Sequence, residues 1–596
     1  MNKNINTNDN SYIFQVNLKG MIELLSEHIY SSPNVFVREL LQNGIDAITA
    51  RKSLDENFSG SINVYINDCE IVFEDSGIGL SEDEVHRFLS VIGQSSKRDN
   101  ILEKDYIGKF GIGLLSCFVV SNEIIVETHS IFGQHPALRW KGKADGTYNL
   151  ETIDLKQFTG TRIILHPKKE WGFLFEEQEL RKNILHFGSA LPVKINLIKA
   201  TGNEVLTDGI SPPVWLNPDS SKSELLEYGR KTFNINFLDA FWLRANTGEI
   251  SGAGFIMPYK IQFTGSKEHK IYMKKMFLCE HSGNLFPEWA SFVKCVVNTN
   301  TLKPTASRES LMENDDLKKA KKELNSVFKD YLRTLSLMDI ETLEKIVEIH
   351  HLYIKALAVE DAELLKLFID YIPFETNRGL QNFKSLRTYN KELYYTPSLD
   401  DFRQIRRIAG YQGYVVINAA YTFEIELIRK ISIVFPETSI KKITPYDILS
   451  NLGETITDDE RFSKFEKRAD RILNSNYCKA QIKKFEPADT PAIYIASDNA
   501  LNNKNIKNLS ESTNPFAKTL QNFIQNKEMS TLCFNKDNPL VNDLLELTDE
   551  TMFEAAVNIL YVQSLMLGHY PVNEREMTIF NDSVYNLLVM GMKIVL

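Results

Sequence analysis

A long helical segment followed at once by two alternating strands most constrains the fold of this chain. Residues 34–54 carry apolar side chains at helical spacing, and residues 61–67 alternate apolar with polar side chains before a second strand at 70–74. Three further apolar runs predict strands, at 123–127, 162–166 and 193–198. Helices and strands in this mixture predict a layered α/β sandwich over roughly the first 198 residues.

The remaining length calls for further folding units. At about 150 residues per domain, a chain of 596 residues predicts about four units. We expect an N-terminal domain over 1–205, a middle domain in two parts over 224–335 and 336–480, and a mainly helical C-terminal domain over 481–596. Residues 206–223 contain three prolines and several small polar residues, which predicts a linker.

Within these later regions the patterns are shorter. The second region is expected to open with a strand at 253–257 and to close with a long helix at 314–335. A short apolar run at 414–418 fits a buried strand in the third region. The Asn-, Ser- and Lys-rich residues 497–512 predict a loop, and residues 549–567 predict a helix.

Composition excludes several classes of protein. The net charge of -10 argues against a general nucleic-acid surface, which favours a basic excess. No apolar run reaches the roughly 18 residues needed to cross a bilayer, and the first ten residues lack the apolar core of a signal peptide. The six cysteines form no C-x-x-C pair, so neither zinc nor a disulfide framework is indicated. We expect a cytoplasmic protein with no nucleic-acid or membrane partner.

The first helix carries a polar stripe. Glu39, Asn43 and Asp46 are spaced by four and three residues, so they share one side of the helix beside its apolar face. A pocket could open at that edge. The alternative is an ordinary amphipathic helix whose polar residues face water.

A carboxylate followed by glycines ends the second strand. Asp75 precedes Gly77 and Gly79, and residues 81–84 read Ser-Glu-Asp-Glu, a capping box that starts a helix. Glycine lets a ligand approach the backbone closely, and a carboxylate can accept a hydrogen bond from an exocyclic amine such as that of adenine. A plain turn is the competing interpretation.

Two more elements complete the pattern. Gly108, Gly111 and Gly113 form a glycine-rich loop that opens a helical segment at 114–120, an arrangement that presents backbone N–H groups to phosphate. Thr161 follows Gly160 at the start of a strand, where its hydroxyl could bond a base directly or through water.

In this order the four motifs resemble those of the gyrase, chaperone, histidine-kinase and mismatch-repair ATPase superfamily. Residues 38–47 and 107–113 are similar to the chaperone version. Residues 271–278, 285–297 and 305–311 closely resemble the middle domain of the Hsp90 chaperones, whose bacterial form is called HtpG. The chain is thus identified as a divergent bacterial member of that family, and the resemblance covers nearly its whole length.

The resemblance implies a role for each matching residue. Glu39 would be the general base that activates water, and Arg308 would reach the γ-phosphate of ATP from the middle domain. Asn43 would help to hold Mg²⁺. Asp75 would read adenine, with Thr161 supporting it through water. The other positions implied to contact ATP are Asp46, Gly79, Gly108, Gly111, Gly113 and Leu114. For Arg308 the alternative is a surface salt bridge with a neighbour such as Glu309.

It also implies an architecture and an activity. The expected fold is α+β and multidomain: an N-terminal α/β sandwich, an αβα middle domain and a mainly helical C-terminal dimerisation domain. The expected protein is an ATP-hydrolysing chaperone that cycles as a homodimeric clamp on client proteins, with a segment near residues 12–16 crossing to the other protomer. The alternatives are a nucleotide-gated binding scaffold with negligible hydrolysis, a DNA-acting relative and, least favoured, a histidine kinase.

Some positions depart from the family pattern. The lid segment between Gly93 and Gly108 is short, with Gln94 and Ser96 in place of a lysine and a glycine. Phe88 stands where an asparagine often contacts nucleotide, and Met312 where a glutamine usually assists the arginine. These changes put lid kinetics and the hydrolysis rate in question.

Overall fold

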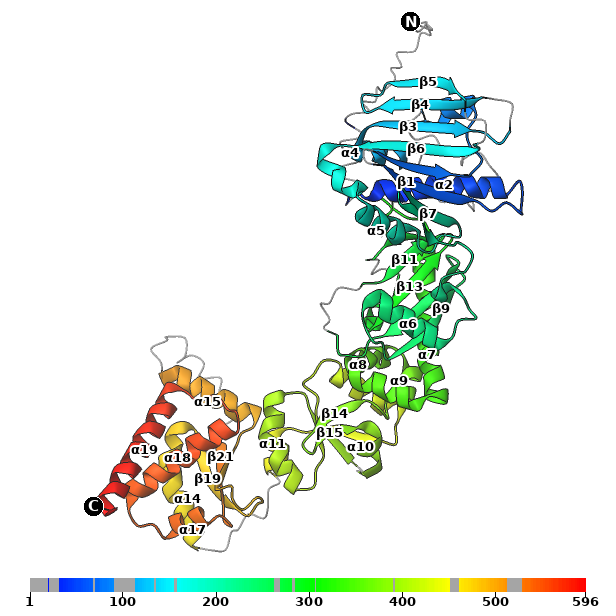
Figure 1. Ribbon diagram of the computed structural model, residues 1–596. Coiled ribbons are helices and arrows are strands. Elements are labelled where there is room, and N and C mark those ends of the chain that lie inside the picture. The colour runs from blue at the N-terminus through cyan, green and yellow to red at the C-terminus, as the bar shows by residue number, and fades with distance from the viewer. Residues whose placement is uncertain are drawn as a thin grey trace, which may run out of the picture. The chain divides into compact units, whose positions relative to one another are not determined.

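The computed structural model describes most of the chain and divides it into two compact units, Met1–Thr342 and Leu343–Leu596 (Figure 1). The described residues are 20, 32–67, 70–89, 113–132, 136–154, 158–261, 268–280, 285–305, 307–389, 392–450, 460–511 and 528–595. Across these ranges, every helix is too short or too polar to cross a membrane. The 12–16 segment and the lid residues 93–108 lie outside them.

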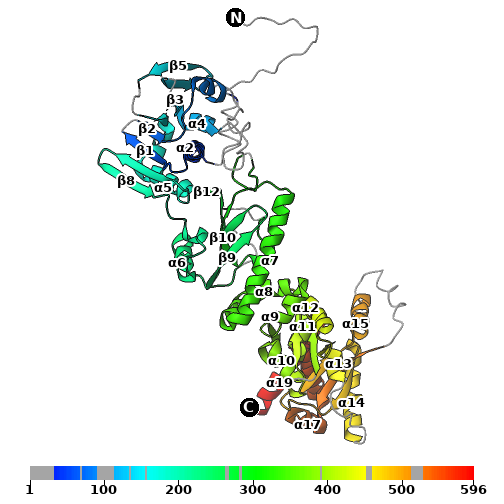
Figure 2. The same ribbon diagram turned by 90° about the vertical axis from the view of Figure 1, so that its right-hand side faces the viewer.

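The first unit begins with a sheet of eight strands in the order β5-β4-β3-β6-β2-β1-β7-β8. Neighbours are antiparallel except β1 and β7, which run parallel. The strands are β1 (Ser61–Asn67), β2 (Glu70–Asp75), β3 (Ser121–His129), β4 (Ala137–Lys143), β5 (Tyr148–Ile153), β6 (Gly160–Pro167), β7 (Lys194–Lys199) and β8 (Gly202–Thr207). Helices α2 (Val35–Lys52), α4 (Cys117–Val120) and α5 (Glu177–Gly188) lie on one face of it (Figure 2). The predicted α/β sandwich is confirmed.

Helix α2 is held by its apolar face. Phe36, Leu40, Leu41 and Ile45 are at most 5% exposed and belong to the core that the sheet contributes to. Burying each such side chain is worth about 1.5–3 kcal/mol. Because this face is fixed on the sheet, the polar stripe beside it is held in place as well.

The start of α3 (Glu82–Glu84) bears out the predicted capping box. The Ser81 hydroxyl accepts from the Glu84 N–H, and the Glu84 carboxylate accepts from the Ser81 N–H at 2.8 Å. A π-helical turn follows at Val85–Leu89.

The second sheet of this unit has five strands in the order β12-β11-β13-β10-β9. They are β9 (Asp239–Ala245), β10 (Ile250–Ile256), β11 (Lys270–Met273), β12 (Met276–Cys279) and β13 (Val293–Thr299), flanked by α6 (Lys222–Phe233) and α7 (Asp315–Met338). The long predicted helix is confirmed, with Asn314 as its N-cap. The region opens with α6 and β9, however, and not with the strand near 253.

The predicted linker is partly wrong. Strand β8 reaches Thr207, a 3₁₀ turn covers Val214–Leu216, and Trp215 within it is 1% exposed. Its ring lies 4.8 Å from that of Tyr272. The prolines had suggested an exposed connection, but the tryptophan between them anchors this segment in the core.

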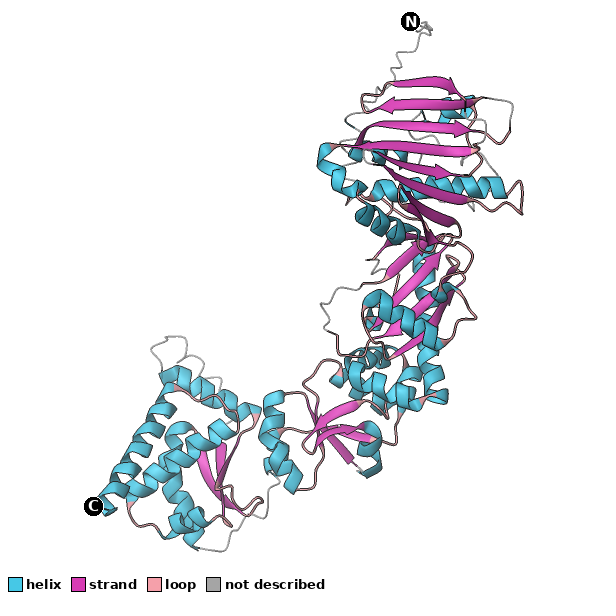
Figure 3. Ribbon diagram, viewed as in Figure 1, coloured by secondary structure: helices cyan, strands magenta, loops and turns pink. Residues whose placement is uncertain are grey.

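The second unit contains two smaller sheets (Figure 3). The first, β15-β14-β17-β16-β18, comprises β14 (Pro373–Thr376), β15 (Gly379–Asn382), β16 (Glu392–Thr396), β17 (Val416–Asn418) and β18 (Ser439–Lys442). The second, β19-β21-β20, comprises β19 (Cys478–Lys483), β20 (Ala492–Ile495) and β21 (Ser530–Asn535). The helices from α8 onward are α8 (Ile340–Glu360), α9 (Ala362–Phe368), α10 (Phe383–Tyr389), α11 (Leu399–Tyr411), α12 (Glu424–Val434), α13 (Pro445–Ser450), α14 (Glu460–Leu473), α15 (Asp498–Glu511), α17 (Pro539–Glu546), α18 (Glu550–Leu567) and α19 (Glu574–Val595).

The loop predicted at 497–512 is wrong, because this segment forms α15. The Ser497 hydroxyl accepts from the Ala500 N–H at 3.1 Å, as a helix cap does. Inside the helix, the buried Lys504 pairs with Glu576 of α19 at 2.8 Å. The segment contains neither glycine nor proline, so a polar composition alone was a poor reason to expect a loop. The helix expected at 549–567 is confirmed as α18, with Asp549 as its N-cap.

Candidate active site

The site begins with a contact between two residues far apart in the sequence. Glu39 lies in α2 and is 2% exposed, and Arg308 lies in the loop between β13 and α7 and is 8% exposed. Arg308 Nη1 lies 3.1 Å from Glu39 Oε2 and 3.4 Å from Oε1, across a sequence separation of 269 residues. The alternative of Arg308 as an exposed surface ion pair is therefore wrong.

The loop that carries Arg308 is closed on itself. Pro304 and Leu311 form an isolated β-bridge, and the Thr305 N–H donates to the Ser310 carbonyl at 2.9 Å. Arg308 itself has φ of 55°, in the left-handed region that costs a non-glycine residue about 1 kcal/mol. This conformation is held from outside the loop as well as from within.

That outside support comes from Arg38, the residue before Glu39. Its Nη1 donates to the Arg308 carbonyl and its Nη2 to the Ser307 carbonyl, both at 3.1 Å. Its Nη2 also lies 3.2 Å from Glu39 Oε1. One guanidinium thus fastens the loop backbone to α2 and pairs with the candidate base. Sequence reasoning gave Arg38 no role, although its place beside Glu39 was a usable signal.

Among the described residues, two guanidinium groups share one carboxylate in this cluster. Arg38 and Arg308 supply two buried guanidinium groups, whereas Glu39 supplies one carboxylate. Because charge is poorly screened where water is excluded, an arrangement of this kind favours an incoming anion. Guanidinium groups match phosphate oxygens in shape as well as in charge.

Gly113 lies directly against the candidate base. A Cβ built on Gly113 would lie 2.3 Å from Glu39 Oε2, so any larger residue would displace the carboxylate. The 3₁₀ turn Gly113–Ser116 then leads into α4, and Leu114 packs at the edge of the core. Gly108 and Gly111 lie outside the described residues.

Asp75 lies at the end of β2 and forms the second part of the site, apart from Glu39 and Arg308. It is 8% exposed, and its Oδ1 accepts from the Gly77 N–H at 2.8 Å. Burial raises the pKa of Asp75 to about 7, against backbone hydrogen bonds from Gly77 and Thr161 that lower it. A buried carboxyl that titrates near neutral pH is typical of a functional position.

The turn after Asp75 is tightly packed. Gly79 has φ of 70°, and a Cβ there would lie 2.1 Å from the His129 carbonyl oxygen. Thr161 pairs with Asp75 across β6 and β2, and its hydroxyl lies 3.1 Å from that of Thr128. The fold therefore brings Asp75, Gly79 and Thr161 together, in a form that glycine alone allows at position 79.

Helix α2 runs from the Glu39–Arg308 contact to the end of β2 at Asp75. A Cβ on Gly44 would lie 3.3 Å from Asp75 Cβ, so the middle of α2 abuts the end of β2. Asp46, 2% exposed, and the half-buried Asn43 lie on the same helix. From Glu39 to Asp46 the helix rises by about 10 Å. Since Glu39 and Asp46 are buried, the water-facing interpretation of the polar stripe is wrong for both.

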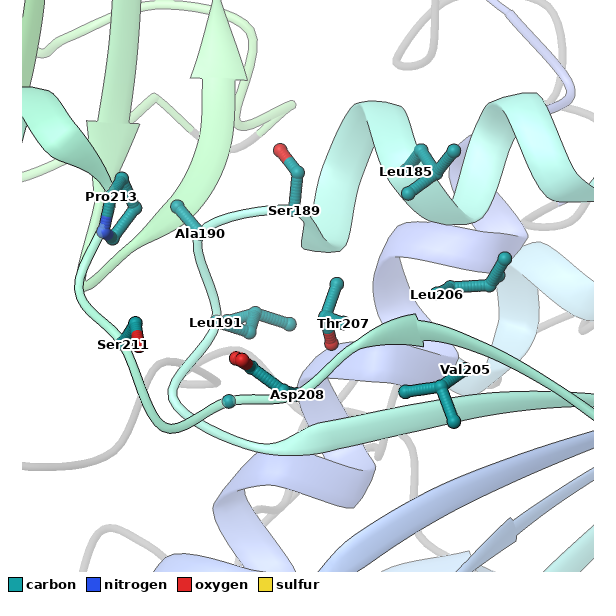
Figure 4. Close-up of a pocket in the computed structure, with 11 residues that line it drawn as sticks. Leu185, Ser189, Ala190, Leu191, Val205, Leu206, Thr207, Asp208, Ser211 and Pro213 are labelled. Carbon is teal, nitrogen blue, oxygen red and sulfur yellow. The ribbon is translucent and has the colours of Figure 1, made fainter. Parts of the chain in front are cut away.

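A separate cavity lies elsewhere in this unit. It measures about 410 Å³ and is bounded by the end of α5, by β8 and by the segment up to Pro213 (Figure 4). Its lining mixes leucines with Ser189, Thr207 and Asp208. None of the predicted site residues lines it, so it is not the nucleotide site.

Comparison with known proteins agrees with this geometry. Residues 257–397 match the family model described as Hsp90 protein, and residues 30–164 match that of the histidine kinase-, DNA gyrase B- and HSP90-like ATPases. The chaperone protein HtpG of Rickettsia rickettsii (strain Sheila Smith) is 28% identical over 343 residues, 52% of this chain and 54% of the relative. That of Chlorobium phaeovibrioides is 26% identical over 437 residues, 66% of this chain and 68% of the relative.

The chain is thus similar to the HtpG proteins of the Hsp90 family in two separate regions. It spans about half the length of the first of these curated relatives. Its first sheet belongs to the ATPase type named by the second family model, which confirms the fold predicted for the N-terminal region.

The described part of the chain also includes two of the positions that depart from the Hsp90 pattern. Phe88 is half-buried, with the Arg87 guanidinium 5.4 Å from the centre of its ring. Met312 is 51% exposed. Gln94 and Ser96 lie outside the described residues.

Proposed function

We propose that this protein is an ATP-dependent molecular chaperone that hydrolyses ATP in its N-terminal domain. The observation that carries the proposal is the 3.1 Å approach of Arg308 to Glu39. A carboxylate on α2, suited to activating water, and a guanidinium in the loop after β13, suited to binding phosphate, meet there. The HtpG relatives and the ATPase family model support the same activity.

Glu39 acts as the general base. Its carboxylate accepts a proton from water as that water attacks the γ-phosphate of ATP, a role that contributes roughly 10²–10⁴-fold to a rate. Arg308 releases Glu39 and donates to the γ-phosphate oxygens, where negative charge grows during transfer. Arg38 keeps the loop in place during this exchange, because it holds the loop by backbone carbonyls.

ATP lies along α2, with its phosphates at the Glu39 end and its base at the Asp75 end. Asp75 accepts from the adenine amino group, Thr161 supports it through water, and Gly79 lets the base approach the backbone. Asp46 and Leu114 line the space between these ends, and Gly108, Gly111 and Gly113 cradle the phosphates. The sheet register and the tight turn at Gly79 support this placement.

Asn43 suits a magnesium ion, because its half-buried amide lies on α2 one turn after Glu39 and Mg²⁺ takes few protein ligands. When bound, the ion would offset the negative charge of the phosphates. In this proposal Asn43 orients the phosphate end of the nucleotide toward Glu39.

The protein acts on unfolded or partly folded client proteins as a homodimer in the cytoplasm. Helix α19 supports the dimer, since Tyr585, Leu588 and Met592 are at least 58% exposed at helical spacing. The working domains are 1–205 for ATP, 224–335 and 336–480 for the middle, and 481–596 for dimerisation. A dimer contact in the last domain makes the meeting of N-terminal domains effectively intramolecular.

The test is the Glu39→Ala variant in an assay with radiolabelled ATP. We expect binding of ATP close to that of the wild type and hydrolysis reduced at least about 100-fold. Undiminished hydrolysis in this variant would remove Glu39 from the mechanism. A wild-type protein without Mg²⁺-dependent turnover would contradict the proposed activity.

A further inference from the structure

Gln42 contacts the same arginine nitrogen as the candidate base. It lies three residues after Glu39 on α2 and is 2% exposed. Its Oε1 accepts a hydrogen bond from Arg308 Nη1, the atom that also pairs with Glu39. The guanidinium is therefore held between a charged carboxylate and a neutral amide.

The loop position at which a glutamine usually assists the arginine offers no strong acceptor here. Met312, four residues after Arg308, is 51% exposed, and its thioether is at best a weak acceptor. Its backbone N–H is occupied by the Lys303 carbonyl at 2.8 Å. Two side-chain acceptors of Arg308, Glu39 and Gln42, lie on α2.

A neutral acceptor suits an arginine that has to change partners. The Glu39 ion pair must open before the guanidinium can reach a phosphate. An amide oxygen orients one edge of the planar fork without adding negative charge that would repel the phosphate. Gln42 is buried on a helix fixed to the sheet, so it stays in place while the loop exchanges its charged partner.

We propose that Gln42 is the positioning residue for Arg308: its side-chain oxygen aims the guanidinium at the γ-phosphate while Glu39 turns to the attacking water. The proposal rests on the proposed function and adds a role for a residue that does not touch the nucleotide. It predicts an effect on turnover that is separate from nucleotide affinity.

The test uses two substitutions in the full chain. Gln42→Met keeps the volume of the side chain and removes the acceptor, whereas Gln42→Glu keeps the acceptor and adds a charge. Gln178→Ala, at an exposed position on α5, is the matched control. Each variant is measured for kcat and KM with Mg²⁺-ATP, for ADP affinity, and for amide hydrogen exchange of residues 303–312 without nucleotide.

For Gln42→Met we expect kcat to fall about tenfold, the kinetic equivalent of one hydrogen bond to a charged group, with KM and ADP affinity within about twofold. Exchange in residues 303–312 becomes faster. For Gln42→Glu we expect the loop to stay protected while kcat falls, because the added charge retains the arginine. In an Arg308→Ala background, Gln42→Met lowers kcat no further.

Three results would overturn the proposal: an unchanged kcat and exchange rate in Gln42→Met, an equal loss of kcat in the Arg308→Ala background, or a loss of ADP affinity matching the loss of kcat. A failure of the proposed function gives a different set of results. If the wild type shows no hydrolysis, the exchange of residues 303–312 still decides whether Gln42 holds Arg308.

Discussion

Each compact unit contains a buried ion pair that joins distant segments, and the two pairs differ in how their charges add up. In the second unit Lys355 of α8 and Glu424 of α12 lie 2.5 Å apart, one cation to one anion, each at most 3% exposed. In the first unit Arg38 and Arg308 share the single carboxylate of Glu39. The first is a one-to-one pair, and in the second two guanidinium groups share one carboxylate.

The surroundings of the two pairs also differ. Lys355 Nζ lies 5.0 Å from the centre of the Phe374 ring, and burial lowers the pKa of Lys355 and raises that of Glu424 while each partner's charge opposes the shift. Arg308 instead sits in a loop at positive φ. A one-to-one pair inside a core is explained by structure alone, whereas two guanidinium groups around one carboxylate, beside an unfavourable backbone conformation, are suited to binding an anion.

The largest effect is expected at the one-to-one pair. Lys355→Met leaves the Glu424 carboxylate buried alone and should lower the free energy of unfolding by about 3–5 kcal/mol, measured by urea denaturation of the full chain. Replacing both partners, as Lys355→Met with Glu424→Leu, should recover most of that loss. Hydrolysis per folded molecule should remain near the wild-type value. A double variant no more stable than the single one would show that the pair is not a simple structural contact.

Substitution of Arg308, which pairs with Glu39, should affect the rate of hydrolysis more than stability. Arg308→Ala should lower kcat for ATP about 10²–10³-fold, as loss of a donor to transition-state charge does. The free energy of unfolding should change far less than in Lys355→Met, because Glu39 keeps its ion pair with Arg38. Arg308→Lys should restore little, since an ammonium lacks the planar fork. Equal losses of stability in Arg308→Ala and Lys355→Met would contradict the proposed difference between the two pairs.

Asp75 adds a pH test of the same site. Its pKa in the folded chain is about 7 against 3.8 ordinarily, so the folded state holds a proton that the unfolded chain has released. Stability without nucleotide should therefore fall as pH rises from about 4 to 7. The ionised carboxylate is the stronger acceptor for the adenine amino group, so ATP affinity should weaken as pH falls below 7. Calorimetric titrations of the wild type and Asp75→Asn should show this slope in the former alone.

The smallest effect should come from an exposed ion pair. Arg139 on the first sheet contacts Glu127 and Glu151, and its side chain is 40% exposed. Arg139→Ala should change the free energy of unfolding by about 1 kcal/mol or less, because solvent screens such pairs. A larger decrease in the free energy of unfolding, measured by urea denaturation, would show that the burial of an ion pair does not predict its contribution to stability in this protein.

The sequence predicted local features well where spacing determines geometry. The helix bearing Glu39, the strand ending at Asp75 and the capping box at Ser81 all follow from residue periodicity and side-chain chemistry. It misjudged 206–223 and 497–512, because Trp215 and Lys504 are buried by partners far away in the chain. Local composition does not indicate contacts with residues far away in the chain.

The same limit applies to the site. The resemblance suggested that Glu39 and Arg308 act together, but spacing alone could not place a residue 269 positions away. Nor could it reveal that Arg38 fastens the loop backbone or that Gln42 shares the guanidinium, since both contacts exist only once the two sheets are packed.

The central claim is that Glu39 and Arg308 serve one terminal phosphate, and a crystal structure with Mg²⁺ and a non-hydrolysable ATP analogue tests it most directly. We expect the Arg308 guanidinium to have left Glu39 and to donate to γ-phosphate oxygens, with Glu39 facing a water in line for attack and Asp75 bonded to the adenine amino group. An analogue bound elsewhere, or bound here with Arg308 still paired to Glu39 and Asp75 turned from the base, would contradict the account.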